Sequence, residues 1–167
     1  MAQQTMSMNI RRAEAIDADD IADAHLDSIR SIGSRFYSVD IVAEWGSRVA
    51  GSLYLNAMKA GEVFFIAIGS AGEPRVLGFS SHRVDDGEHR TAVYVRGSAA
   101  RRGMGSALFR AAEADAVAAG APSIHVDASL AAVDFYLENG FVEIGKGQHP
   151  IGTNLLMPCV FMRKDLR

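Results

Sequence analysis

Residues 93–108 read VYVRGSAARRGMGSAL, and this stretch decides the fold. An apolar, β-branched run leads into a basic turn, in which one residue separates Gly103 from Gly105, and an alanine-rich helical pattern follows. This order predicts a strand, a glycine loop and a helix N-terminus. Free backbone N–H groups and the helix dipole at such a terminus favour a bound phosphate group. The first expectation is therefore a phosphate-bearing ligand at this turn.

The composition around this segment indicates one globular domain over residues 1–167. A net charge of -3 and the lack of a Lys/Arg run give no nucleic-acid-binding face. Cys159 is the only cysteine, so the sequence excludes a disulfide framework and fits a reducing compartment. No apolar segment is long enough to span a membrane, and the histidines lack metal-ligand spacing. We expect a cytoplasmic protein without nucleic-acid or membrane partners and without a metal.

Hydrophobic periodicity and turn residues predict a mixed sheet with helices packed on it. A first strand is expected at residues 8–13, followed by a helix capped by Asp17, whose buried stripe should contain Leu26 and Ile29. Two short helices follow, around residues 40–46 and 51–61. The remaining strands are expected at residues 62–69, 75–84, 91–95, 124–128, 141–146 and 155–162. Helices are expected between residue 104 and Gly120, and over 131–138.

Three phosphate-binding motifs compete for the glycine turn. A P-loop requires a lysine after its second glycine, and none is present here. A dinucleotide fingerprint requires a third glycine where Leu108 stands, although Asp127 at the end of the next strand keeps a dinucleotide-dependent oxidoreductase as an alternative. The third candidate ligand is coenzyme A.

Two motifs carry a resemblance to one family. Residues 100–105 (ARRGMG) are similar to motif A of the GNAT-type N-acetyltransferases, [QR]-x-x-G-x-[GA], with Ala100 in place of the usual Gln or Arg. Residues 129–141 (SLAAVDFYLENGF) resemble the second signature, N-x-x-A-x-x-F-Y-x-x-x-G-F, with Ser129 in place of Asn. One helix and one strand separate the motifs, in the family's order. The resemblance implies an α/β (α+β) GNAT fold, whose central mixed, mostly antiparallel sheet of six to seven strands is flanked by helices.

The resemblance also implies how acetyl-CoA, as co-substrate, is held. The loop and the first helical turn would bind the pyrophosphate, and a strand would pair with the pantetheine arm, with the N–H of Val95 as an oxyanion donor. Ser129 and Phe135 come from the second motif. The expected coenzyme-binding residues are Tyr94, Val95, Arg101, Arg102, Gly103, Met104, Gly105, Ser106, Ala107, Ser129 and Phe135.

The resemblance implies direct attack of a primary amine on the thioester. Tyr136 stands where the family places the acid that protonates the leaving thiolate, although it also fits an aromatic core residue. His89 and Glu88 lie near the family's general base, and strand alternation lets only one of them face the cleft. Asp127 is a third candidate for the base.

The sequence indicates only the chemical class of the acceptor. A small-molecule or peptide amine is expected, and the negative net charge weakly favours a cationic acceptor. Trp45 is either a pocket wall or a core anchor. The resemblance to the family is also compatible with a homodimer. A non-catalytic module that senses acyl-CoA is the remaining alternative.

Overall fold

The computed structural model describes residues 8–167 and shows a seven-stranded sheet in the order β1-β2-β3-β4-β5-β7-β6. The strands are β1 (Asn9–Arg12), β2 (Val63–Ile68), β3 (Val76–Asp85), β4 (Glu88–Val95), β5 (Ser123–Ser129), β6 (Val142–Ile151) and β7 (Leu155–Asp165). All neighbouring strands are antiparallel except β4 and β5. The predicted fold class, a mixed and mostly antiparallel sheet flanked by helices, is confirmed.

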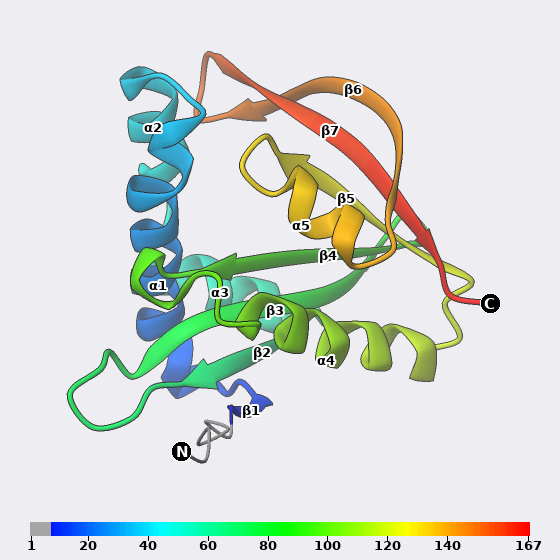
Figure 1. Cartoon of the computed structure of the whole chain (residues 1–167), viewed down its shortest axis with the longest axis horizontal. Helices are drawn as coiled ribbons and strands as arrows, with labels where there is room; N and C mark the ends of the chain where they lie inside the picture. The colour runs from blue at the N-terminus through cyan, green and yellow to red at the C-terminus, as the bar shows by residue number, and fades with distance from the viewer. Residues whose placement is uncertain (1–7) are drawn as a thin grey trace, which may run out of the picture.

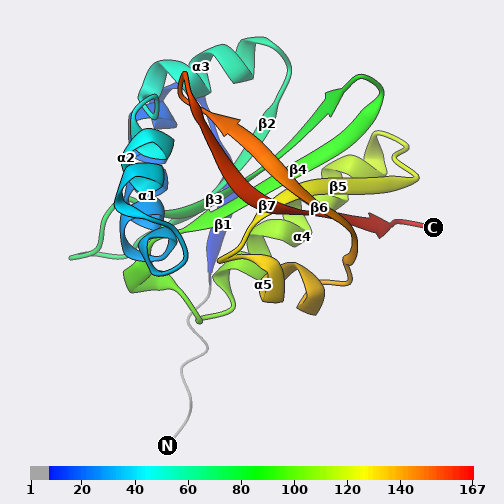
Figure 2. The same cartoon turned by 90° about the horizontal axis from the view of Figure 1, so that it is seen from above.

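Two layers of helices cover the sheet (Figures 1 and 2). Helices α1 (Ala18–Ser31), α2 (Val39–Gly46) and α3 (Gly51–Lys59) lie on one side, and α4 (Met104–Ala118) and α5 (Val133–Glu138) lie on the other. Short 3-10 turns occur at Ala15–Asp17, Gly33–Arg35 and Gly97–Ala99. Each helix face packs its own apolar cluster, so the protein has a core on both sides of the sheet.

The buried face of α1 differs from the expected one. Ile29 is buried as predicted, but Leu26 is only partly buried, and Ile21, His25 and Ser28 are buried as well. The buried face of the helix therefore includes polar side chains. The imidazole of His25 lies among the rings of Tyr54, Phe79 and Tyr94.

The sheet changes character where β4 meets β5. These strands share a single register pair, Arg90 with His125, whereas β3 and β4 share eight. Beyond this pair the two strands diverge, as Figure 1 shows. The sheet thus consists of two halves, β1–β4 and β5–β7–β6, with a gap between them on the side of the glycine loop.

The hairpin of β6 and β7 is longer than the sequence predicts. Strand β6 extends to Ile151 instead of ending near Lys146, and it reaches across to α2 (Figure 1). Gly145 and Gly147 interrupt the hydrophobic alternation of β6, which hid the strand. A Cβ at Gly147 would lie 2.3 Å from the ring of Phe161 on β7, so a larger residue here would force that ring to move.

Candidate active site

The glycine loop joins β4 to α4 with two residues in the left-handed region. Gly103 is the N-cap of α4 at φ 76°, and Arg101 has φ 62°. Met104, Gly105 and Ser106 form the first helical turn, whose N–H groups have no intrahelical acceptor. The loop therefore presents free donors at the positive end of a fifteen-residue helix. This geometry fits a pyrophosphate.

Helix α5 packs directly on this loop. A Cβ at Gly105 would lie 3.0 Å from the ring of Phe135, so the missing side chain leaves space for that ring. The amide of Asn139 donates to the hydroxyl of Ser106 at 3.2 Å. Both motifs found in the sequence thus meet in space, and the second holds the first in place.

The two arginines of the loop differ in their partners. The Arg102 guanidinium donates to the carbonyl of Ser98 at 2.8 Å and lies 3.4 Å from the carboxylate of Glu73. Arg101 is exposed and forms no ion pair within residues 8–167. Arg101 is therefore the loop guanidinium that is available to an incoming phosphate, whereas Arg102 must first leave Glu73.

A cavity of about 190 Å³ occupies the gap between β4 and β5. Val93, Val126, Ala128, Ala132 and Tyr136 line it from the side of α4 and α5. The other side is lined by residues that face α1–α3, namely Trp45, Arg83, Arg90, Ala92, Tyr94, Asp127, Ser129, His149, Met157 and Cys159. The cavity therefore passes through the sheet from one helical layer to the other.

The backbone N–H groups of β4 point alternately toward β3 and toward this gap. The N–H of Arg96 donates to the carbonyl of Leu77 on β3 at 2.8 Å. In an antiparallel pair the hydrogen-bonding direction alternates, so the N–H groups of Val93 and Val95 turn away from β3 and toward the gap. The Tyr94 backbone faces β3, and its side chain packs on His25 with ring centroids 4.0 Å apart. Val95 is thus the backbone group open to a ligand, whereas the N–H of Val93 donates to the hydroxyl of Tyr136.

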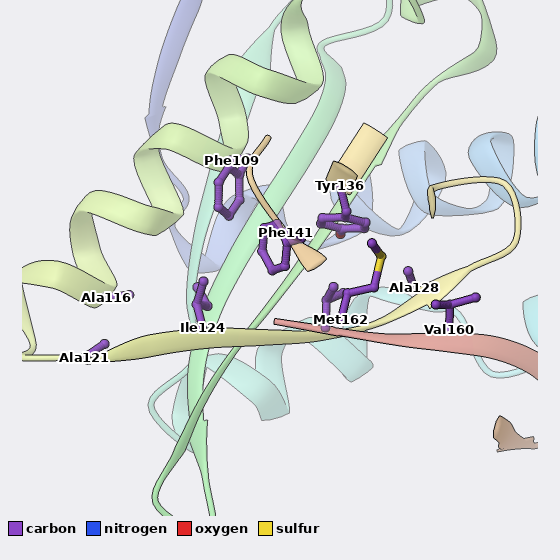
Figure 3. Close-up of a cluster of buried hydrophobic side chains, with 10 residues drawn as sticks. Phe109, Ala116, Ala121, Ile124, Ala128, Tyr136, Phe141, Val160 and Met162 are labelled. Atoms are coloured by element: carbon purple, nitrogen blue, oxygen red, sulfur yellow. The ribbon is translucent and has the colours of Figure 1, made fainter. Parts of the chain in front are cut away.

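Tyr136 belongs both to the core and to the cavity wall. It is 2% exposed and packs against Phe141, with ring centroids 5.0 Å apart (Figure 3). Burial raises the pKa of its phenol, nearby Tyr94 adds to the rise, and a backbone hydrogen bond with Val93 opposes it. The phenol is therefore protonated at neutral pH and lies beside the donors of β4.

The structure does not bring His89 or Glu88 to the cavity. His89 faces α4, where its Nδ1 lies 2.9 Å from Nε2 of His82, whose Nδ1 is 2.7 Å from the carboxylate of Asp115. Burial and the neighbouring imidazole lower the pKa of His89. Glu88 lies on the opposite face of β4, where it forms an ion pair with Arg90. The alternation that was expected for this pair is present, but both side chains are engaged outside the cavity.

Arg90, Asp127 and His149 line the cavity instead. Arg90 donates to Asp127 at 2.6 Å, and the second oxygen of Asp127 lies 3.6 Å from Nδ1 of His149. Asp127 was a candidate from sequence, but Arg90 and His149 were not assigned to the site. His149 could not be placed because the interrupted pattern of β6 concealed the strand that carries it.

Aromatic side chains close the end of the cavity under α1 and α2. Trp45 lies at its wall, with its ring 6.2 Å from that of Tyr94. The Tyr37 hydroxyl donates to the carbonyl of Pro158 at 2.6 Å and accepts from the N–H of Leu130 at 2.8 Å. Tyr37 thereby ties the N-terminal helical layer to β7 and to the loop after β5, across the gap.

Comparison with known proteins now decides the family. Residues 34–157 match the family model described as "Acetyltransferase (GNAT) domain". The chain belongs to the GNAT acetyltransferase family. It is an acetyl-CoA-dependent N-acetyltransferase. None of the curated proteins matches the sequence significantly.

Solved structures of this family share the whole fold. A GCN5-related N-acetyltransferase from Rhodopseudomonas palustris is 26% identical, with a TM-score of 0.84 over 99% of this chain and 100% of that one. The PaiA N-acetyltransferase from Thermoplasma acidophilum, solved in complex with coenzyme A, is 17% identical, with a TM-score of 0.77 over 96% and 99% of the two chains. A ribosomal-protein-alanine N-acetyltransferase from Brucella melitensis is 20% identical, with a TM-score of 0.67 over 95% and 99%.

Two features are absent from the part of the chain that the structure describes. Within residues 8–167, no group of three or more His, Cys, Asp or Glu side chains is arranged to hold a metal ion. In the same part of the chain, no helix has the length and apolar character needed to cross a membrane.

Proposed function

We propose that an amine enters the cavity from the side of α1–α3 and directly attacks the thioester of acetyl-CoA bound from the side of α4 and α5. The continuous cavity through the gap between β4 and β5 carries this proposal, because it connects the glycine loop's side of the sheet to the charged and aromatic end. Acetyl-CoA supplies the acetyl group as a thioester. The acceptor is a small-molecule or peptide amine.

The donor half of the site is assigned to the loop and to β4. The N–H groups from Arg102 to Ala107 and the guanidinium of Arg101 would hold the pyrophosphate. Val95 offers its backbone N–H to the oxyanion that forms at the carbonyl oxygen of the thioester. Ser129 offers a hydroxyl at the cavity wall, and Phe135 acts through Gly105 by positioning the loop.

Tyr136 would stabilise the leaving thiolate. Its raised pKa places the phenol well above a thiol, whose ordinary pKa is about 8.5, so complete proton transfer to sulfur is unfavourable. A phenol that stays protonated is nevertheless a strong hydrogen-bond donor to the negative charge that develops on sulfur. We therefore assign Tyr136 to hydrogen bonding of the thiolate as the C–S bond breaks.

The proton of the acceptor amine would leave through His149. Its Nδ1 faces Asp127, which leaves Nε2 free to accept a proton, and imidazole suits this task near neutral pH. Asp127 acts as the positioning residue and is itself fixed by Arg90. This assignment replaces His89 and Glu88, because neither lines the cavity.

A thiol-release assay with acetyl-CoA and a panel of amines tests the proposal. We expect Tyr136→Phe to lower kcat about 10²-fold or more while acetyl-CoA affinity changes little. We expect His149→Gln to lower kcat about 10²-fold or more while acetyl-CoA affinity changes little. Gln148→Ala, which alters the exposed neighbour on β6, is the matched control and should behave as wild type.

Two results would count against this reading. Binding of acetyl-CoA without release of coenzyme A by any amine would favour the sensing module. Unchanged turnover in the Tyr136→Phe variant would remove that residue from the mechanism.

Compartment and assembly follow as secondary proposals. A cytoplasmic location is supported by Cys159, which is buried and unpaired. A homodimer is supported by the exposed apolar side chains of Val142 and Ile144 on β6, an edge strand of the sheet. Light scattering of the purified protein tests the second point.

A further inference from the structure

The charged side chains at the acceptor end of the cavity are not equally engaged. Arg90 is 18% exposed at its side chain and forms ion pairs with Glu88 at 2.5 Å and with Asp127 at 2.6 Å. Its charge is therefore balanced by two carboxylates. The donors of Arg90 are thus occupied by side chains of the protein itself.

Arg83 on β3 is the second guanidinium of the cavity, and it is barely engaged. The carboxylate nearest to it belongs to Glu62 and lies 3.9 Å away, which is beyond hydrogen-bonding distance. Its side chain is 44% exposed, and it forms no hydrogen bond within residues 8–167. The cavity thus contains a guanidinium whose donors are free for a ligand.

The register of the sheet places the two guanidiniums next to each other. Arg83 lies directly opposite Arg90 in the β3–β4 pair, on the same face of the sheet. Two carboxylates within 2.6 Å compensate the charge of Arg90, whereas Arg83 has only Glu62 at 3.9 Å. Arg83 is therefore the guanidinium of the cavity that has room for the carboxylate of a ligand.

We propose that the acceptor carries a carboxylate as well as its amine, and that Arg83 binds this carboxylate. The inference rests on the proposed function, since it places the amine beside Asp127 and His149. The planar guanidinium matches a carboxylate with two parallel N–H···O bonds, which gives both affinity and orientation. Arg83 is in this view a specificity-determining residue that acts on binding and not on the chemical step.

The test compares acceptors that differ only in the carboxylate. Each ω-amino acid from glycine to 6-aminohexanoate is paired with the n-alkylamine of equal chain length, and L-phenylalanine is paired with phenethylamine. We expect at least one carboxylate-bearing member to exceed its partner about tenfold or more in kcat/KM. Arg83→Gln should raise KM for that member about tenfold, with little change in kcat and none for the plain amine. Arg110→Gln, an exposed arginine on α4, is the control and should retain the preference.

A binding measurement separates this inference from the proposed chemistry. The N-acetylated forms of the same pairs are titrated against the protein with coenzyme A present and followed by ligand-observed NMR. Preferential binding of the carboxylate-bearing forms, lost in Arg83→Gln, supports the inference even if no amine is acetylated, an outcome that would reject the proposed function alone. The inference is overturned if no carboxylate-bearing member is preferred in either measurement, or if Arg83→Gln leaves the preference unchanged.

Discussion

Replacement of Asp17 by asparagine should destabilise the protein in a manner that depends on pH. The Asp17 side chain is fully buried at the point where β1, α1 and β3 meet. Its carboxylate accepts two hydrogen bonds from Arg11 at 2.8 and 2.9 Å, one from Arg75 at 2.8 Å and one from the N–H of Glu14 at 2.8 Å. Hydrogen bonding from Arg11 is the largest cause that lowers the pKa of Asp17 from 3.8 to about 2.

This pKa sets both the size and the pH range of the effect. A carboxyl group with its pKa lowered from 3.8 to about 2 contributes about 2.5 kcal/mol to the free energy of unfolding near neutral pH. Because the pKa is depressed in the folded state, the contribution is complete above pH 3.8 and is lost as pH falls toward 2. About half of it should remain at pH 3.

Urea denaturation of wild type and Asp17→Asn at pH 6, 4 and 3 measures this contribution. The difference in unfolding free energy should be about 2–3 kcal/mol at pH 6 and should narrow to about half at pH 3. Asp20→Asn is the matched control, because Asp20 binds the same Arg75 at 2.7 Å but has a side chain that is 40% exposed. It should cost less than about 1 kcal/mol. A difference for Asp17→Asn that stays constant between pH 6 and 3 would refute the reasoning.

Three further substitutions test features around the gap. Tyr37→Phe removes two hydrogen bonds and should cost about 1–3 kcal/mol in urea denaturation, whereas an unchanged midpoint would show that the hydroxyl does not tie the halves together. Gly147→Ala forces a Cβ into the ring of Phe161 and should lower Tm by several degrees; a Tm equal to that of wild type would mean that the β6–β7 hairpin shifts without cost. Arg101→Gly relieves a left-handed backbone and should stabilise the free protein by about 1 kcal/mol, yet it should raise KM for acetyl-CoA; an unchanged KM would remove Arg101 from phosphate binding.

The sequence predicted best where local pattern and tertiary structure agree. Residues 93–108 form a strand, a glycine loop and a helix because β-branched residues, a left-handed glycine and an alanine-rich face each favour those structures on their own. Asp17, read from the sequence only as a helix cap, instead holds two arginines from distant segments. No local signal reports such a contact.

Most of the acceptor half of the site could not be predicted from the sequence, because it too depends on contacts between distant segments. Arg83 and Arg90 stand seven residues apart on two strands, and only the hairpin register brings them opposite each other. His149 comes from a strand whose two glycines break the alternation that identifies strands. His89 was favoured by residue type and position, but pairing with His82 accounts for its surroundings. Residue type indicates which chemistry a side chain can perform, whereas the direction in which each side chain points depends on the register of the sheet.

The two halves of the sheet, which share a single register pair between β4 and β5, correspond to two continuous segments of the chain. Everything from β1 to α4 lies before Gly120, and everything from β5 to β7 lies after it. Contacts between the two segments run along β4 and β5, and come also from α2 on β6 and β7, from α4, whose Phe109 packs on Phe141, and from the Tyr37 hydroxyl. Only one register pair of the sheet crosses this division, so the polypeptide should open as two cooperative units in native-state hydrogen exchange. Separately expressed fragments cut at the turn around Gly120 should reassemble into an active enzyme, and acetyl-CoA, by filling the seam, should drive their association.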